Sequence, residues 1–330
     1  MSAHHQGARI KVVLGIALVV GLVGVYFVRA RLAGTKCTTG IASHLHSMKE
    51  GLASDSYAGY RSACEHGEKI VRDFDPALYS AHAYLAYAYA IRWGEHGDAT
   101  EALAKSHLAK AQAAKMEHSH LAAAETYIQF FGGDRTGAVT RLAAMIEENK
   151  RAGRKSTLLT SVLGIIQMRI GDLENAYKNL KAAQTLAPAD LRINAALCEL
   201  LRRQGSKYLP REDGSESVLL GRHTGAQLDL VQMAIEAGKW QTAEKYARKV
   251  LTTEPPPSPR QLAVAHVALA VILDHKDLRT EADKEQTAAL ELRRPSPDLD
   301  ALLLRRHSRS GADSAEAVGF GRADAPDGGG

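Results

Sequence analysis

The first feature of the hydrophobic pattern is an uncharged apolar run near the beginning of the chain. It covers Val12–Val28, 17 residues bounded by Lys11 and Arg29. A helix that crosses a bilayer needs about 17–25 such residues, whereas the core of a signal peptide has about 7–15. Tyr26 and Phe27 stand near one end, where aromatic side chains favour the membrane interface. The pattern therefore predicts an uncleaved transmembrane anchor.

This anchor divides the start of the chain into a polar tail over residues 1–11, a span at 12–28 and a juxtamembrane linker at 29–44. A cleaved signal peptide and a buried helix are the alternative interpretations of the run. Basic residues flank the run on both sides, so the positive-inside rule gives nearly equal support to the two orientations in the membrane. Because a positively charged amino-terminal tail translocates poorly, we expect the body of the protein on the extracytoplasmic, periplasmic side. A body that faces the cytoplasm is the alternative.

Beyond the anchor, small and apolar residues recur at helical spacing and form a repeating unit. In residues 157–190 a Gly-Asp turn is followed by the spacing A-x3-L-x2-A-x4-P. Its four fixed positions are Ala176, Leu180, Ala183 and Pro188. The same spacing, whole or in part, begins again at Cys64, Ala104, Ala138, Ala243 and Ala282. The copies lie at intervals close to 34 residues, and a period of this kind is typical of a repeat protein.

Each fixed position of the repeating unit has a physical explanation. Glycine ends a first helix in a tight turn because it adopts positive φ at low cost. A small residue early in the second helix lets the two helices cross closely, and proline stops the second helix. The pattern therefore predicts helical hairpins that stack in a row and pack on their neighbours.

The unit resembles the tetratricopeptide repeat (TPR). The opening of that family's first helix is approximated by His82-x2-Leu85-Ala86-x2-Tyr89, with His82 where the family often has Trp. The resemblance covers residues 45–296 and implies an all-α fold, a right-handed α-solenoid of about six to seven TPR-like hairpins. These hairpins are expected near residues 45–78, 79–114, 119–152, 157–190, 191–223, 224–257 and 263–296.

Three segments depart from the regular repeat. The turn Gly94–Gly97 is longer than usual, and a stiff proline-rich linker over Glu254–Pro259 precedes the last hairpin. An irregular insert at 206–222 contains Gly, Pro and Asp, which indicate a loop in place of most of a second helix.

Residues 305–330 are rich in Gly, Ala, Ser, Asp and Arg, so we expect a disordered tail.

Composition agrees with a helical repeat protein and argues against other classes. Aromatic residues make up only 5%, while alanine, the best helix former, is abundant. The net charge of +5 comes from 42 basic and 37 acidic residues, too close a balance to indicate nucleic-acid binding. Three cysteines without CxxC spacing and the lack of a phosphate-binding loop or a hydrolase motif give no sign of a cofactor or metal site. The 14 histidines are interpreted as solvated or helix-capping.

Candidate contact residues follow from the resemblance, which implies that first helices line the concave side of the solenoid. They are Tyr87, Tyr127, Phe130, Met168, Arg169, Arg192, Arg202 and Arg203, with Glu199 beside them. Packing between repeats is the alternative role for the tyrosines, whereas the arginines Arg169, Arg202 and Arg203 are expected to be exposed because arginine is costly to bury. Aromatic residues at one end of a groove and arginines at the other would suit an extended or helical segment of acidic character.

We therefore expect a membrane-anchored scaffold for protein–protein interactions in cell-envelope assembly, secretion or motility, and not an enzyme. One alternative is a permanent structural subunit of a membrane complex. Another is an enzyme with its site in residues 206–223, where Glu212, Asp213, Glu216 and His223 lie.

Overall fold

The computed structural model describes residues 38–205, 220–292 and 299–306. Within these ranges all the regular structure is helical, with no strand. Of the segments expected from the sequence, the anchor at 12–28, most of the insert at 206–222 and nearly all of the tail at 305–330 lie outside the described residues. Among the helices inside them, none combines the length and the apolar character that a membrane span requires.

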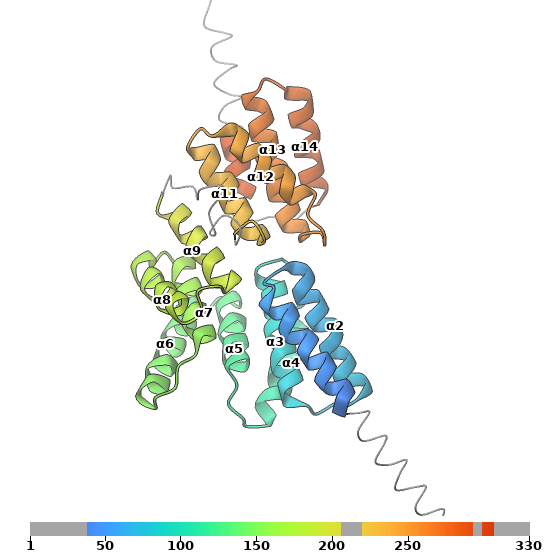
Figure 1. Cartoon of the computed structure of the whole chain (residues 1–330), viewed down its shortest axis with the longest axis vertical. Helices are drawn as coiled ribbons and strands as arrows, with labels where there is room; N and C mark the ends of the chain where they lie inside the picture. The colour runs from blue at the N-terminus through green and yellow to red at the C-terminus, as the bar shows by residue number, and fades with distance from the viewer. Residues whose placement is uncertain (1–37, 206–219, 293–298, 307–330) are drawn as a thin grey trace, which may run out of the picture.

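The helices alternate between an inner and an outer row (Figure 1). The inner helices are α3 (Tyr79–Gly94), α5 (Ser119–Phe131), α7 (Thr157–Arg169), α9 (Leu191–Arg203), α11 (Thr224–Glu236) and α13 (Pro259–His275). The outer helices are α2 (Tyr57–Asp73), α4 (Glu101–Ala113), α6 (Arg135–Arg151), α8 (Leu173–Leu186), α12 (Trp240–Leu251) and α14 (Arg279–Glu291). A helix over residues 38–53 precedes α2, and a short helical segment at 299–306 follows α14.

Contacts between these helices follow the order of a stacked repeat. Each inner helix from α3 to α11 packs on the next inner helix, and most pack on the outer helix of their own hairpin and of the preceding one. The exceptions are α9 and α11, which pack directly on each other; residues 206–219, between them in the chain, lie outside the described residues. The arrangement is a TPR-like α-solenoid, as the recurring spacing predicted.

The hairpin turns show why the Gly-Asp pairs recur. Gly133 and Gly171 adopt φ values of +108° and +89°, which side-chain-bearing residues rarely reach. The aspartate that follows each glycine then caps the next helix, with Asp134 accepting from the N–H of Gly137 at 2.9 Å and Asp172 from that of Asn175 at 3.3 Å. One dipeptide therefore ends the inner helix and starts the outer one.

Within a hairpin, the two helices approach closely at Gly164 on α7. A Cβ atom at this position would lie 2.7 Å from Leu180 Cγ and 3.1 Å from the carbonyl oxygen of Ala176, both on α8. Since real Cβ atoms do not come so close to a buried neighbour, a side chain here would push α7 and α8 apart. The Leu163-Gly164 pair of the repeat unit thus sets the distance between the helices.

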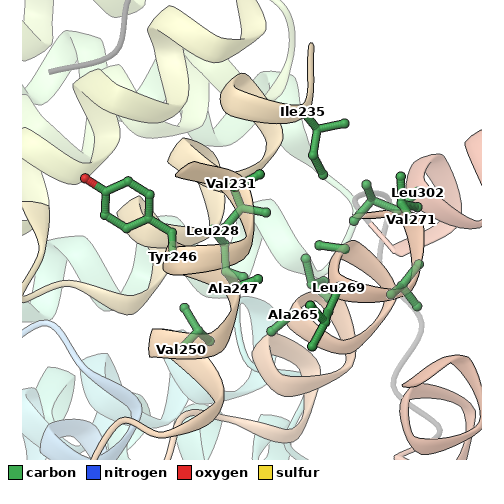
Figure 2. Packing of buried hydrophobic residues seen from close by; sticks show 14 of the residues in the cluster. Leu228, Val231, Ile235, Tyr246, Ala247, Val250, Ala265, Leu269, Val271 and Leu302 are labelled. Atoms are coloured by element: carbon green, nitrogen blue, oxygen red, sulfur yellow. The ribbon is translucent and has the colours of Figure 1, made fainter. Parts of the chain in front are cut away.

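Two large apolar clusters fill the spaces between the rows. The amino-terminal cluster runs from the helix over residues 38–53 to α7 and is rich in tyrosine. The carboxy-terminal cluster joins α11, α12, α13, α14 and the segment at 299–306, and it consists mainly of Val, Leu, Ile and Ala (Figure 2). In Figure 2, Leu228 and Val231 of α11 lie near Ala247 and Val250 of α12, with the side chains of α13 beside them.

The solenoid also curls far enough to bring distant repeats together. The turn before α2 contacts the first residues of α9 and α11, and the turn after α3 contacts α13. These contacts enclose the candidate site.

Candidate functional site

A cavity of about 500 Å³ lies on the inner side of the curl. Its walls come from five inner helices, α5, α7, α9, α11 and α13, from the first turns of the outer helices α2 and α6, and from two turns, the one before α2 and the one after α3. Among the described residues, the charged side chains that line it are Asp55, Glu95, Glu199, Asp229, Arg135, Arg169, Arg192, Arg203 and Arg260. Phe130 and Phe131 add an aromatic wall. The cavity therefore combines five guanidinium groups with four carboxylates.

Arg192, in the first turn of α9, is the centre of a buried polar cluster. One guanidinium nitrogen, Nη1, donates to Asp55 Oδ1 at 2.8 Å and to the Tyr60 hydroxyl at 3.1 Å. The other, Nη2, donates to Glu95 Oε1 at 2.7 Å and to the Tyr127 hydroxyl at 2.6 Å. The side chain is only 12% exposed, so these partners take the place of water.

Asp55 joins this cluster from a strained backbone position. Its φ is +43°, a conformation that aspartate tolerates better than most residues. The carboxylate accepts from Arg192, from the Tyr60 hydroxyl and, at 3.0 Å, from His223 Nε2. Burial opposes ionisation of Asp55, but the charge of Arg192 and the hydrogen bonds of His223 and Tyr60 outweigh it and hold the pKa well below the usual range. The group therefore stays ionised at neutral pH.

Glu95 is shared by two arginines. Besides Arg192, it pairs with Arg169 Nη2 at 3.1 Å, and the Arg169 guanidinium lies 5.6 Å from the centre of the Phe131 ring. Burial again opposes the charge, but Arg192 and Arg169 lower the pKa of Glu95. A single carboxylate thus ties α7 and α9 to the turn after α3.

That turn, Gly94–Gly97, is held from the other side by Arg260 of α13. Arg260 Nη1 donates to the carbonyl oxygens of Gly94 at 3.2 Å and Glu95 at 2.9 Å. Gly97 has φ +77°, and a Cβ there would lie 2.6 Å from Arg260 Nη2. The extra length of this turn lets it reach across the curl, and glycine lets it pass close to the guanidinium.

His96, between Glu95 and Gly97, lies in the cavity wall. It is only 7% exposed, and its ring packs against Tyr57 and Tyr60, with centroids 5.2 and 6.0 Å away. Burial lowers its pKa to about 4, against the opposing charges of Glu95, Asp55 and Asp98. The ring is therefore neutral at pH 7.

Four of the eight expected contact residues line the cavity: Phe130, Arg169, Arg192 and Arg203. Tyr87 and Tyr127 are 2% and 0% exposed in the amino-terminal cluster, the packing role that the sequence left open. Met168 is fully buried between α7, α8 and α9. These three residues show no surface to a partner in this conformation.

The expected exposure of the arginines is wrong for two of them. Arg169 is 23% exposed because Glu95 supplies its counter-charge, and Arg202 is 13% exposed because it donates to Asp229 at 2.6 Å and to Gln232 at 2.9 Å. Arg203, paired with Glu199 at 2.7 Å, is 36% exposed. A carboxylate from another repeat offsets part of the desolvation cost of burying an arginine.

Sequence reasoning missed four of the residues that build the site, Asp55, Glu95, His96 and Arg260, and named His223 only for the enzyme alternative. The only signal was the unusual length of the turn Gly94–Gly97. The interpretation of the histidines as solvated or helix-capping is wrong for His82, His96 and His107, which are buried. It is confirmed for His118 and His223, which cap α5 and α11. Within the described residues, no group of three or more His, Cys, Asp or Glu side chains is placed to hold a metal ion.

Comparisons with known proteins identify the fold. No protein-family model and no curated protein matches the chain. Among solved structures, it is similar to human IFIT1 as a dimer with PPP-AAAA, at 17% identity and a TM-score of 0.57, covering 80% of this chain and 64% of that one. A monomeric variant of IFIT1 with m7Gppp-AAAA gives 18% identity and 0.57, covering 80% and 63%.

A third similar structure is the Cut9–Hcn1 hetero-tetramer of the APC/C, at 14% identity and a TM-score of 0.53, covering 75% of this chain and 48% of that one. These are helical repeat proteins of the TPR type. The chain spans less than two thirds of the length of each. At such low identities the likeness establishes the TPR-type fold and nothing finer.

Proposed function

We propose that this protein is a scaffold that holds an acidic segment of a partner protein in the cavity on the inner side of its solenoid. The observation that carries the proposal is the lining of the cavity, where guanidinium groups and a phenylalanine wall lie together on the inner helices. Arginine and aromatic residues are enriched in binding hot spots, and a guanidinium recognises a carboxylate through paired hydrogen bonds.

The charges that line the cavity suit a ligand with a single carboxylate better than a polyanion. Asp55, Glu95, Glu199 and Asp229 line the same cavity and would repel a nucleic acid or a chain of phosphates. Two of the similar structures hold PPP-AAAA or m7Gppp-AAAA, and the third is an assembly of two proteins. We expect this chain to resemble the third in its kind of partner and to bind no nucleic acid.

Arg135 offers a way to test this without disturbing the fold. It is exposed at the start of α6, it lines the cavity, and its guanidinium lies 5.8 Å from the centre of the Phe130 ring. Arg141, on the same helix, is 53% exposed, pairs with Glu125 and does not line the cavity. The two arginines make a matched pair for substitution.

The experiment uses fluorescence polarisation of the full chain in detergent with an array of peptides of about ten residues. Each peptide that contains Glu or Asp is compared with its Gln or Asn counterpart, and PPP-AAAA is a further probe. We expect the acidic peptides to bind best, Arg135→Ala to weaken them by about threefold to tenfold, and Arg141→Ala to leave them unchanged. Equal binding of acidic and amide peptides, or preferential binding of PPP-AAAA, would contradict the proposal.

We further propose that residues 12–28 anchor the chain in a membrane with its body on the extracytoplasmic side. The support is the 17-residue apolar run between Lys11 and Arg29. The full chain should then resist carbonate extraction and keep its amino terminus, and a reporter that works only outside the cytoplasm should be active when fused after Gly330. Activity of a cytoplasmic reporter instead would reverse the orientation.

The two alternative functions make different demands. A permanent subunit would stay with its partner through gentle solubilisation and not exchange with added acidic peptide, whereas a docking scaffold would exchange. For the enzyme alternative, His223 is the one of its four residues that the structure describes, and it caps α11 and bonds Asp55, both structural roles. We therefore favour the scaffold, with a place in cell-envelope assembly, secretion or motility.

A further inference from the structure

A row of hydrogen bonds through two buried histidines joins α2, α3 and α4, away from the residues that line the cavity. His82 of α3 and His107 of α4 are 2% and 4% exposed. Their Nδ1 atoms lie 2.8 Å apart and their ring centres 5.1 Å apart. At the two ends of the row, His82 Nε2 lies 2.9 Å from the carbonyl oxygen of Pro76, and His107 Nε2 lies 3.0 Å from Glu68 Oε1. All four ring nitrogens therefore have a partner.

These contacts require more hydrogens than two neutral rings carry. A carbonyl or carboxylate oxygen only accepts, so each Nε2 atom must carry a hydrogen. The contact between the two Nδ1 atoms needs one more, on one ring or the other. Three hydrogens are thus required on four nitrogens, whereas two neutral imidazoles carry two. The contacts are satisfied together when one of the two rings is an imidazolium.

The third hydrogen belongs on His82. Burial lowers the pKa of His107, and the charges of His82 and Lys110 act in the same direction against that of Glu68, so His107 is the neutral ring. It donates from Nε2 to Glu68 and accepts at Nδ1 from His82, which then donates from both of its nitrogens. The Glu68 carboxylate also accepts from the Tyr89 hydroxyl at 3.0 Å, and its side chain is 38% exposed to water. His107 therefore links a buried positive charge to a carboxylate at the surface.

The helices around the two rings bring a small set of other ionisable groups. Burial raises the pKa of Cys64 on α2 to about 12 and holds the pKa of Tyr89 on α3 above its usual range, so both stay neutral. Arg92, also on α3, pairs with Asp98 at 2.7 Å. The nearby histidines contact other groups: His44 pairs with His66, and His118 and His120 pack on Tyr84.

We propose that His82, His107 and Glu68 form a pH switch, which fastens α4 to α2 and α3 while the third hydrogen is bound and loosens it when that hydrogen leaves. Without the hydrogen, one of the three contacts joins two acceptor atoms and becomes repulsive. The turn Gly94–Gly97 lies between α3 and α4, so the switch also acts on one end of a turn that lines the cavity. The switch works in the same way whatever the cavity binds.

The three residues contribute most to stability near pH 6.5. At that pH each histidine of the unfolded chain carries about half a proton, so the pair binds about one, as the folded cluster does. As pH rises further, the unfolded chain releases its proton first, because only the folded chain holds it with hydrogen bonds. Stability then falls with rising pH. It also falls below pH 6.5, where the unfolded pair takes up a second proton that the buried His107 resists.

The test measures amide hydrogen exchange of the full chain in detergent, by mass spectrometry, at pH 6.5 and pH 8.5. Base catalysis speeds exchange in every helix alike, so the rate in α4 is divided by the rate in α8, two hairpins further along. We expect this ratio to rise about tenfold between the two pH values, the scale of one hydrogen bond to a charged group. A ratio that stays constant would overturn the inference.

Two variants on α2 separate the switch from a general effect of pH. Glu68→Gln keeps an acceptor for His107 but removes the negative charge, so the third hydrogen is held less tightly. Its ratio should already be raised at pH 6.5 and should rise by less than about threefold toward pH 8.5. Glu65→Gln is the matched control, since Glu65 is 71% exposed and pairs with Arg61, and it should behave like the original chain. Equal behaviour of the two variants would contradict the role of Glu68.

NMR of the full chain labelled with ¹⁵N-histidine counts the hydrogens directly. The signals of the two rings are assigned by their loss in His82→Gln and in His107→Gln. We expect three N–H groups on the two rings at pH 6.5 and two at pH 8.5. Two at both pH values would show that both rings are neutral throughout and that no switch exists. If either assignment variant fails to fold, the exchange ratios of Glu68→Gln and Glu65→Gln decide between these outcomes.

Discussion

Two interior regions hold this solenoid together, and they do so in different ways. The carboxy-terminal apolar cluster joins helices that follow one another in the chain, from α11 to α14 (Figure 2). The polar cluster around Arg192 joins residues that are 97 and 137 positions apart. The first is the nearest-neighbour packing expected of a repeat protein, whereas the second couples distant repeats. The stability of this solenoid therefore depends on contacts between distant repeats as well as on contacts between neighbouring ones.

The two regions also respond to different variables. Apolar packing depends on the area removed from water and on the fit of side chains, so it is indifferent to pH. A buried ion cluster balances a large desolvation cost against its pairings, and removing one member leaves the others uncompensated. Substitutions in the two regions should therefore differ in size and in pH dependence.

The largest effect is expected for Arg192→Met. The substitution keeps much of the side-chain volume but leaves Asp55 and Glu95 buried with less counter-charge, which should cost about 3–5 kcal/mol of unfolding free energy. Because Arg192 joins distant repeats, the denaturant transition should also broaden as the two halves begin to unfold separately. Urea unfolding followed by circular dichroism measures both.

A triple variant sharpens this test. Adding Asp55→Asn and Glu95→Gln to Arg192→Met removes the stranded charges, so a large part of the lost stability should return. If Arg192→Met alone costs less than about 1 kcal/mol, the polar cluster does not hold the curl together.

The second largest effect is acid sensitivity. The pKa of His96 is about 4 in the folded protein, against 6.5 as its ordinary value, so the unfolded state binds more protons between these pH values. Stability is then fully present above pH 6.5 and is lost as pH falls toward 4, by about 3 kcal/mol from this group. His118 and His120, which are half-buried beside Tyr84, also have pKa values lowered by burial and act in the same direction.

Urea titrations at pH 7, 5.5 and 4.5 measure this loss. His96→Asn should flatten the dependence, since asparagine does not titrate, while the remaining histidines keep a smaller slope. A variant with the same slope as the original chain would show that His96 does not carry the effect.

A smaller effect, about 1 kcal/mol, is expected for Ile272→Val in the apolar cluster. Ile272 is fully buried on α13, and losing one methylene removes transfer energy and leaves a small void. The cost should be equal at pH 7 and 5, because the groups that surround it in the cluster are apolar. A cost that changed with pH would mean that the two regions are coupled.

The smallest effect is expected at the surface. Lys178 and Glu174 form an ion pair of 2.6 Å on α8, with both side chains more than half exposed. Lys178→Ala should change the unfolding free energy by no more than about 0.5 kcal/mol, and the change should vanish in high salt. A larger change in the same urea titration would place Lys178 in a contact that its exposure does not suggest.

The sequence predicted the apolar region better than the polar one. The slots Ala176, Leu180 and Ala183 are all fully buried, because helical periodicity is a local property that neighbouring residues determine. The Gly-Asp turns were equally visible, since conformational freedom and capping act over a few residues. Local rules thus sufficed for the helices, their turns and the order in which they stack.

The polar region depends on contacts that no local rule describes. Arg169 and Arg202 were expected to be exposed because arginine is costly to bury, but Glu95 and Asp229 reach them from other repeats. The pairing of Arg169 with Glu95 follows from the curl of the solenoid, whereas that of Arg202 with Asp229 follows from the direct packing of α9 on α11. The long turn Gly94–Gly97 marked the right place, although its length alone did not indicate what it would meet.

The separation of the polar cluster along the chain also has a consequence for synthesis. Asp55 leaves the ribosome 137 residues before Arg192 and 168 residues before His223. At about 5–20 residues per second, these delays are roughly 7–34 s. The early hairpins can pack as they emerge, but the acidic groups on their inner side wait in water for partners still being translated. A nascent chain that stops before α9 would therefore contain Arg169, the first partner of Glu95, but would leave Asp55 without Arg192 and His223. Asp55 is then a negative charge without these two partners, which only the longer chain supplies.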